Sequence, residues 1–191
     1  MRLLQETSRP DPDLDKLEDI VKREVSLSYK LLRYINSVRR ALMMLGQQGT
    51  RKWASMVVVS NIGSDTPSEL VVSAVIRAKF CEMIAQASRM RDRQHDLFLL
   101  GLFSLMDVMI GRPLPAILAD LPIAEDVKRA LEGKDNDLRT VYDLVLAYER
   151  GDWTPVARLA RDIGLELDVL PSLYCTALEW GDSTGELDEA S

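Results

Sequence analysis

Residues 98–107 read FLLGLFSLMD, and this stretch decides the fold class. Apolar side chains occupy nearly every position around its helical projection, which is typical of a helix buried on all sides. Gly101 sits in the middle, where the missing side chain lets another backbone approach closely. The stretch therefore predicts a helix over residues 97–110 at the centre of a helical core.

The periodicity is helical in the segments on either side as well. Gly111, Pro113 and Pro115 follow the central helix and predict its end. Residues 57–59 are three valines with strand character, but no second segment could pair with them. The predicted fold class is therefore an all-α, multi-helix bundle. Apart from the central helix, the later helices are expected at residues 68–90, 116–120, 124–131, 138–148, 154–163 and 167–180.

Composition places the chain among globular proteins. It has 191 residues, of which 47% are hydrophobic and 28% charged, enough for one core with a small helical extension. No window has the apolar length of a membrane span, and the first residues are polar where a signal peptide would be apolar. We therefore expect a cytoplasmic protein without membrane insertion. Cys81 and Cys175 lie in helical patterns and are expected to be reduced, buried thiols, with a single disulfide as the alternative.

Charge is distributed unevenly along the chain. Residues 1–100 hold 16 Lys and Arg against 12 Asp and Glu, whereas residues 101–191 hold 8 against 18. A net charge of −6 argues against nucleic acid as the main ligand. The basic segment 22–52 could dock an acidic partner, although solvated helix faces would give the same pattern. The candidate partner surface comprises Arg33, Arg39, Arg40, Arg51, Lys52 and Trp53.

Tryptophan could also serve as an anchor for a partner. Trp53 and Trp153 both stand close to arginines, and exposed aromatic side chains of this kind dominate many interfaces. Partial burial within the bundle is nevertheless the expected state of both.

The central stretch resembles the helix on which HD-type metallophosphohydrolases carry adjacent His and Asp ligands, in a pattern such as GLLHDIG. The matching pair here is Ser104-Leu105. A serine hydroxyl is a poor ligand for a transition metal and a leucine is none. The resemblance therefore implies the scaffold of an enzyme at a degenerate HD position, with no cofactor, no metal and no catalytic residue.

The chain also contains one literal His-Asp pair, His95-Asp96, which includes the only histidine in the sequence. An HD-type site needs several His and Asp ligands from different helices, so this pair is interpreted as incidental. We expect both side chains to be exposed at a helix start. The alternative function is a metal-dependent phosphohydrolase or cyclic-dinucleotide phosphodiesterase, with residual metal chemistry through His95, Asp96 and Asp107.

Several longer phrases resemble the HDOD domain, a family with the HD-type helical fold that lacks the metal ligands and is associated with bacterial signal transduction. These are LLQE (3–6), DIVK (19–22), VSLSYKLLRYINS (25–37), IRAKFCE (76–82) and AYERGDW (147–153). The last two are similar to the subgroup in which an HDOD domain follows an EAL-type cyclic-di-GMP phosphodiesterase domain.

The resemblance covers essentially the whole chain and implies its organisation. We expect an HDOD-like core over residues 1–112, a helical part packed on it over 113–181, and a disordered acidic tail over 182–191. The implied function is a non-catalytic signalling module that docks on a protein partner or on an upstream EAL-type domain.

One departure from the family lies after YINS, residues 34–37. The family usually has an aromatic-Gly turn and a short polar stretch here, whereas Ser37 runs directly into Val38. Either the loop is lacking or residues are omitted at this point, and the missing turn chemistry favours omission.

Overall fold

The computed structural model describes residue 55 and residues 68–119, 121 and 123–185. Every regular element in these ranges is helical, as the periodicity predicts. No described helix has the length and apolar character needed to cross a membrane. The chain is thus all-α over the part that can be described.

The centre of the bundle is the antiparallel pair α5 (Ser68–Ala87) and α6 (Gln94–Phe103). All residues from Leu97 to Phe103 are buried, as their apolar projection predicts. A Cβ added to Gly101 would lie 2.6 Å from the Ala78 Cα atom and 2.7 Å from the Arg77 carbonyl oxygen. Only glycine allows the two helix backbones to pass this closely.

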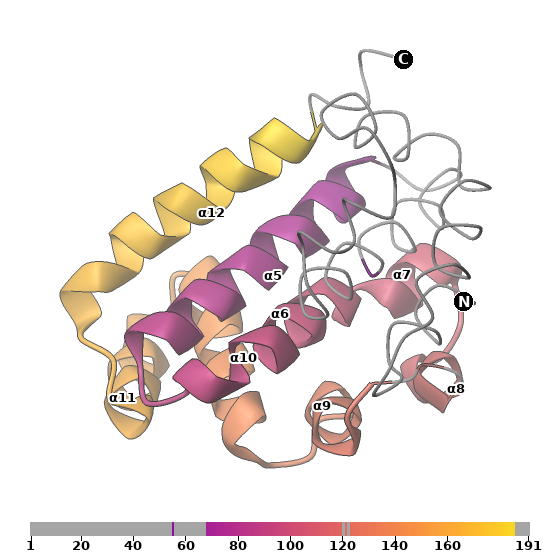
Figure 1. The fold of residues 1–191 in the computed structure, drawn as a ribbon, viewed down its shortest axis with the longest axis horizontal. Helices are drawn as coiled ribbons and strands as arrows, with labels where there is room; N and C mark the ends of the chain where they lie inside the picture. The colour runs from indigo at the N-terminus through magenta and orange to yellow at the C-terminus, as the bar shows by residue number, and fades with distance from the viewer. Residues whose placement is uncertain (1–54, 56–67, 120, 122, 186–191) are drawn as a thin grey trace, which may run out of the picture.

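The C-terminal helices cover this pair from two sides (Figure 1). Helix α12 (Leu170–Gly185) runs along α5, while α10 (Asp137–Glu149) and α11 (Trp153–Ile163) form a second packed pair that contacts α5 through α10. The smaller helices α7 (Met106–Ile110), α8 (Leu114–Ala119) and α9 (Glu125–Leu131) continue from α6. One hydrophobic cluster connects these layers.

The predicted helix over residues 97–110 is wrong in one respect, because it is broken at the degenerate HD position. Helix α6 ends at Phe103 and α7 begins at Met106. The Ser104 hydroxyl donates to the Gly101 carbonyl oxygen at 2.7 Å, and Leu105 adopts φ −115° and ψ 9°. A serine side chain that bonds its own backbone competes with the helical ladder, and this explains the break.

Other helix ends differ from the predictions by a few residues. Helix α5 ends at Ala87, and a short 3-10 helix, η2 (Arg91–Arg93), precedes α6. Helix α8 begins two residues earlier than predicted, because Pro115 lies in its first turn, where a backbone N–H is not needed. A second 3-10 helix, η3 (Leu167–Val169), precedes α12.

Helix α12 extends to Gly185, so it includes residues 182–185 of the segment expected to be a tail. The rest of that segment, 186–191, lies outside the described residues.

The two cysteines have different environments. Cys81 is fully buried in the core, as predicted. Cys175 is exposed, so the prediction of a second buried thiol is wrong. It lies on α12 on a face shared with Ser172 and Thr176, away from the buried Ala177. Helical periodicity alone did not show which face this cysteine occupies.

Candidate functional site

Ser104 and Leu105 lie at the junction of α6 and α7, both half-buried. The Ser104 hydroxyl oxygen accepts a hydrogen bond from Nη1 of Arg77 at 3.1 Å while donating to Gly101. Both hydrogen-bonding directions of the hydroxyl are therefore used by the protein itself. At the position that resembles the metal-binding pair, Ser104 is therefore in contact with an arginine side chain.

Arg77 makes its other contacts with Glu149 in a two-point ion pair. Its Nε atom donates to Oε1 at 3.0 Å, and its Nη2 atom donates to Oε2 at 2.6 Å. The side chains are only 13% and 21% exposed, so water screens the pair weakly. Burial disfavours the charge on Arg77, but the hydrogen bond and the charge of Glu149 outweigh it and raise the pKa of Arg77. The Arg77 guanidinium, which extends from α5, is therefore held by Glu149 of α10 and by Ser104 directly after α6.

Titratable side chains around this pair are held in their protonated forms. Burial raises the pKa of Tyr142, and contact with the Ser104 hydroxyl only partly offsets this effect. Burial and the nearby charge of Glu149 also raise the pKa of the Cys81 thiol, against the opposing effect of Arg77. A nucleophilic cysteine needs a lowered pKa, so the predicted role of Cys81 as a core thiol agrees with its surroundings.

An aromatic cluster continues from the ion pair to the surface. Phe80 contacts Tyr148 and Tyr174 with ring centroids 5.4 and 5.0 Å apart, and Tyr148 meets the Trp153 ring edge-on at 5.6 Å. Trp153 is 63% exposed, so the expected partial burial is wrong for this residue. It stands in the first turn of α11, beyond the Gly151 turn, where its ring meets that of Tyr148.

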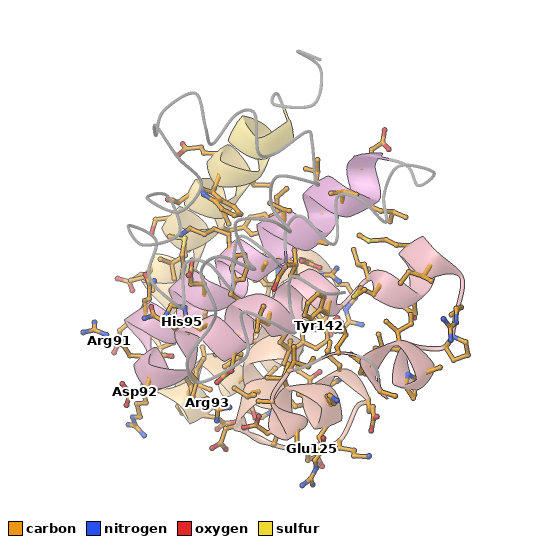
Figure 2. The ribbon with its side chains drawn as sticks, turned by 45° about the vertical axis from the view of Figure 1, so that its right-hand side comes forward. Arg91, Asp92, Arg93, His95, Glu125 and Tyr142 are labelled. Atoms are coloured by element: carbon orange, nitrogen blue, oxygen red, sulfur yellow. The ribbon has the colours of Figure 1, made fainter. Side chains whose placement is uncertain are left out.

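The His95-Asp96 pair lies apart from this position, in the first turn of α6. Figure 2 shows His95 near the η2 residues Arg91, Asp92 and Arg93. The Asp96 carboxylate accepts from Arg93 at 2.8 Å, and Arg93 also pairs with Asp126 of α9. Both His95 and Asp96 are half-buried rather than exposed as expected, because α6 packs closely on α5. The Nδ1 atom of His95 has no hydrogen-bond partner among the described residues. The structure does not join Asp96 to His95 in a shared site.

No group of three or more His, Cys, Asp or Glu side chains within the described ranges could hold a metal ion. Asp107 stands in the first turn of α7, on the far side of the helix break from His95. The residual ligands considered for a degenerate metal centre are thus not assembled by this part of the fold. The candidate partner surface (Arg33, Arg39, Arg40, Arg51, Lys52 and Trp53) lies outside the described residues and stays a prediction.

Sequence reasoning missed Arg77 and Glu149 as partners. They belong to the phrases IRAKFCE and AYERGDW, the two that resemble the EAL-linked subgroup. The two phrases therefore pointed to both residues separately. Their contact could not be predicted, because residues 72 positions apart meet only through the way α5 and α10 cross.

Comparison with known proteins gives one family and two relatives. The model of the HDOD domain family matches residues 1–111. The chain is 32% identical, over 98% of its length, to "Cyclic di-GMP phosphodiesterase CdgJ" from Vibrio cholerae, and 30% identical, over 93% of its length, to "Uncharacterized protein YuxH" from Bacillus subtilis. The matched region is 46% of each relative, so the chain spans less than half the length of either. No solved structure gives a significant match.

Proposed function

The chain belongs to the HDOD family, and from this premise we propose that it is a non-catalytic regulatory module of cyclic-di-GMP signalling in the bacterial cytoplasm. It acts by docking on a protein and does not itself hydrolyse a phosphodiester. The V. cholerae relative that bears the name of a phosphodiesterase supports the pathway, since nearly all of this chain matches part of it. The likeness of two phrases to the EAL-linked subgroup makes an EAL-type domain the proposed partner, in the same polypeptide or in another.

One observation supports the non-catalytic role. At the degenerate HD position, the Ser104 hydroxyl accepts a hydrogen bond from Arg77, and the same guanidinium is paired with the Glu149 carboxylate. A divalent metal would need carboxylate or imidazole ligands there, and a positively charged guanidinium beside it would repel the ion. The chain has one histidine, too few for the several that an HD-type centre uses.

The first experiment measures bound metal and hydrolysis on the same purified, tag-free protein. Elemental mass spectrometry should find no stoichiometric iron, manganese or zinc. Incubation with cyclic di-GMP and added Mg²⁺ or Mn²⁺ should yield no linear dinucleotide above a protein-free blank. Stoichiometric metal together with turnover that is lost in Asp107→Asn would instead support the alternative, a phosphohydrolase with a degenerate HD site.

The second experiment tests docking through the proposed basic surface. The portion of the V. cholerae relative that this chain does not match provides a defined partner, and calorimetry measures its affinity for the chain. Reversing two charges in Arg51→Glu/Lys52→Glu should weaken binding by about tenfold or more, since rim charges of opposite sign steer and hold such complexes. Lys128→Glu/Arg129→Glu on α9 is the matched control and should leave affinity unchanged. Equal affinities of the parent, the charge-reversed variant and the control would remove the candidate partner surface from the proposal.

A further inference from the structure

A polar hollow opens between the start of α10 and the middle of α11, and it shares no residue with the α6–α7 junction. Its volume of about 450 Å³ falls within the range of small-molecule sites, about 300–1,000 Å³. None of its walls belongs to the candidate partner surface, so a ligand bound here is separate from the proposed docking. The walls include Asp135, Arg139, Thr140 and Asp143 on the α10 side, and Arg158 and Leu159 of α11.

Arg139 presents a fixed guanidinium in this hollow. Its Nη1 atom donates to the Ala130 carbonyl oxygen at 3.1 Å, and its Nη2 atom lies 2.8 Å from Oδ1 of Asp143. Its Cζ atom stands 5.4 Å from the ring centroid of Tyr142, which is not one of the hollow's walls. One face of the guanidinium is thus covered by a ring, and the other is left for a ligand. A planar guanidinium held in this way is a stacking surface for a nucleobase.

Carboxylates and a second guanidinium provide polar groups around this surface. Asp143 is 41% exposed and meets Arg139 through Oδ1, so its Oδ2 atom can accept from a ligand. Asp135 is exposed in the loop directly before α10. Arg158 is 67% exposed, and its Nη1 atom stands 3.7 Å from Asp162, a loose pair that leaves most of its donors available. A matching ligand offers N–H donors to the carboxylates and an anionic group to Arg158.

We propose that this hollow binds a guanine nucleotide. The base stacks on Arg139, its N1–H and amino groups donate to Asp143 and Asp135, and its phosphate lies beside Arg158. Guanine places two N–H donors side by side, which suits a carboxylate, whereas adenine has a ring acceptor next to its amino group. Leu159, almost fully buried, supplies an apolar wall for the base.

The first test is calorimetry of the full chain with four ligands: GMP, AMP, guanosine and cyclic di-GMP. GMP should bind about tenfold or more tightly than AMP, because adenine would turn an acceptor towards a carboxylate. Guanosine, which lacks the phosphate, should bind more weakly than GMP. A mononucleotide and a cyclic dinucleotide carry the same base, and whichever of GMP and cyclic di-GMP binds more tightly identifies the source of the ligand.

The second test assigns the binding to this hollow. Asp143→Asn should weaken GMP binding by about tenfold or more and reduce the preference over AMP, since an acceptor is replaced by a donor. Asp135→Asn, in an exposed loop, should act in the same direction without affecting the fold. Arg158→Met should weaken binding of GMP but not of guanosine. Arg161→Met, exposed on the same helix and outside the hollow, is the matched control and should bind GMP as the parent does.

Two kinds of result would overturn the proposal. One is the absence of binding of both GMP and cyclic di-GMP at millimolar concentration, or equal affinity for GMP and AMP. The other is guanine binding that is unchanged in Asp143→Asn, Asp135→Asn and Arg158→Met alike, because the ligand would then occupy a different site. Circular dichroism of each variant checks that its fold is retained.

Discussion

At the scale of single residues, close backbone packing depends on Gly101. Its hydrogen atom faces Ala78 on α5, and a methyl group there would meet backbone atoms 2.6–2.7 Å away. Backbone cannot rotate aside as a flexible side chain can, so the helices would have to move apart.

We therefore predict that Gly101→Ala lowers the melting temperature by about 4–10 °C, the range expected for overpacking by about 2–3 kcal/mol in a chain of this size. Differential scanning calorimetry would measure it. Ala119→Ser, exposed on α8, is the control and should shift the melting temperature by no more than about 2 °C. A Gly101→Ala protein as stable as this control would contradict the close packing of α5 on α6.

Tyr142 gives a residue-scale prediction about alkaline pH. Burial raises its pKa in the folded state, whereas the unfolded chain loses this proton near pH 10. Above about pH 10 the unfolded state thus binds fewer protons, so the free energy of unfolding falls as pH rises, and the contribution is fully present below that value.

Melting temperatures between pH 8 and 11 would test this, with Tyr142→Phe as the comparison. The variant should lose stability less steeply than the parent above pH 10, whatever its stability at pH 8. Parallel curves for the two proteins would show that another group governs the alkaline transition.

At the scale of elements, the start of α10 depends on one asparagine. The Asn136 side-chain oxygen accepts from the backbone N–H of Arg139 at 2.8 Å, and its Nδ2 atom donates to the carbonyl oxygen of Asp126 at 2.8 Å. One side chain thereby caps α10 and ties it to the start of α9. This matters for the site because α10 carries both Tyr142 and Glu149.

We predict that Asn136→Ala lowers the free energy of unfolding by about 1–3 kcal/mol, since a helix cap and a tertiary hydrogen bond are lost together. Asn136→Asp should recover part of this loss, because its carboxylate can still accept from Arg139 but has no donor for Asp126. Urea denaturation followed by circular dichroism would rank the three proteins. Equal losses in both variants would show that the cap contributes little.

Helix class was predictable because buried periodicity depends on near neighbours, and residues 97–103 are buried as predicted. The break at Ser104 was not, because it depends on a hydroxyl that bonds Gly101 and receives Arg77 from another helix. Lack of metal ligands at Ser104-Leu105 was readable from residue types alone, whereas the Arg77–Glu149 pair required knowledge of how α5 and α10 cross. Exposure of Trp153 and Cys175 was likewise decided by which helix face the packing left uncovered.

At the scale of the whole molecule, the described helices form one packed body rather than two (Figure 1). Helix α12 lies along α5, and Gly181 allows this approach, since a Cβ there would stand 2.3 Å from Cγ1 of Ile76. The core shared by the family-matched residues and the C-terminal helices is continuous. Within the described residues, the two parts bury apolar side chains against each other.

We therefore predict a single cooperative unfolding transition. Because Cys175 is exposed, the test uses the chain carrying Cys175→Ser. Circular dichroism, which follows all helices, and the accessibility of Cys81, which lies in the core between the two parts, should give the same denaturation midpoint in this protein. Two separate midpoints would show that the C-terminal helices unfold on their own, against the continuous core.

The contact between Arg77 and Glu149 also bears on how the protein matures in the cell. A domain held together by a metal ion is finished only after the ion is delivered, so its amount follows the supply of that nutrient. At the α6–α7 junction, by contrast, the contacts join three side chains of the protein itself, Arg77, Ser104 and Glu149. These contacts therefore need only the packing of α5 and α10 at the end of α6 in order to form.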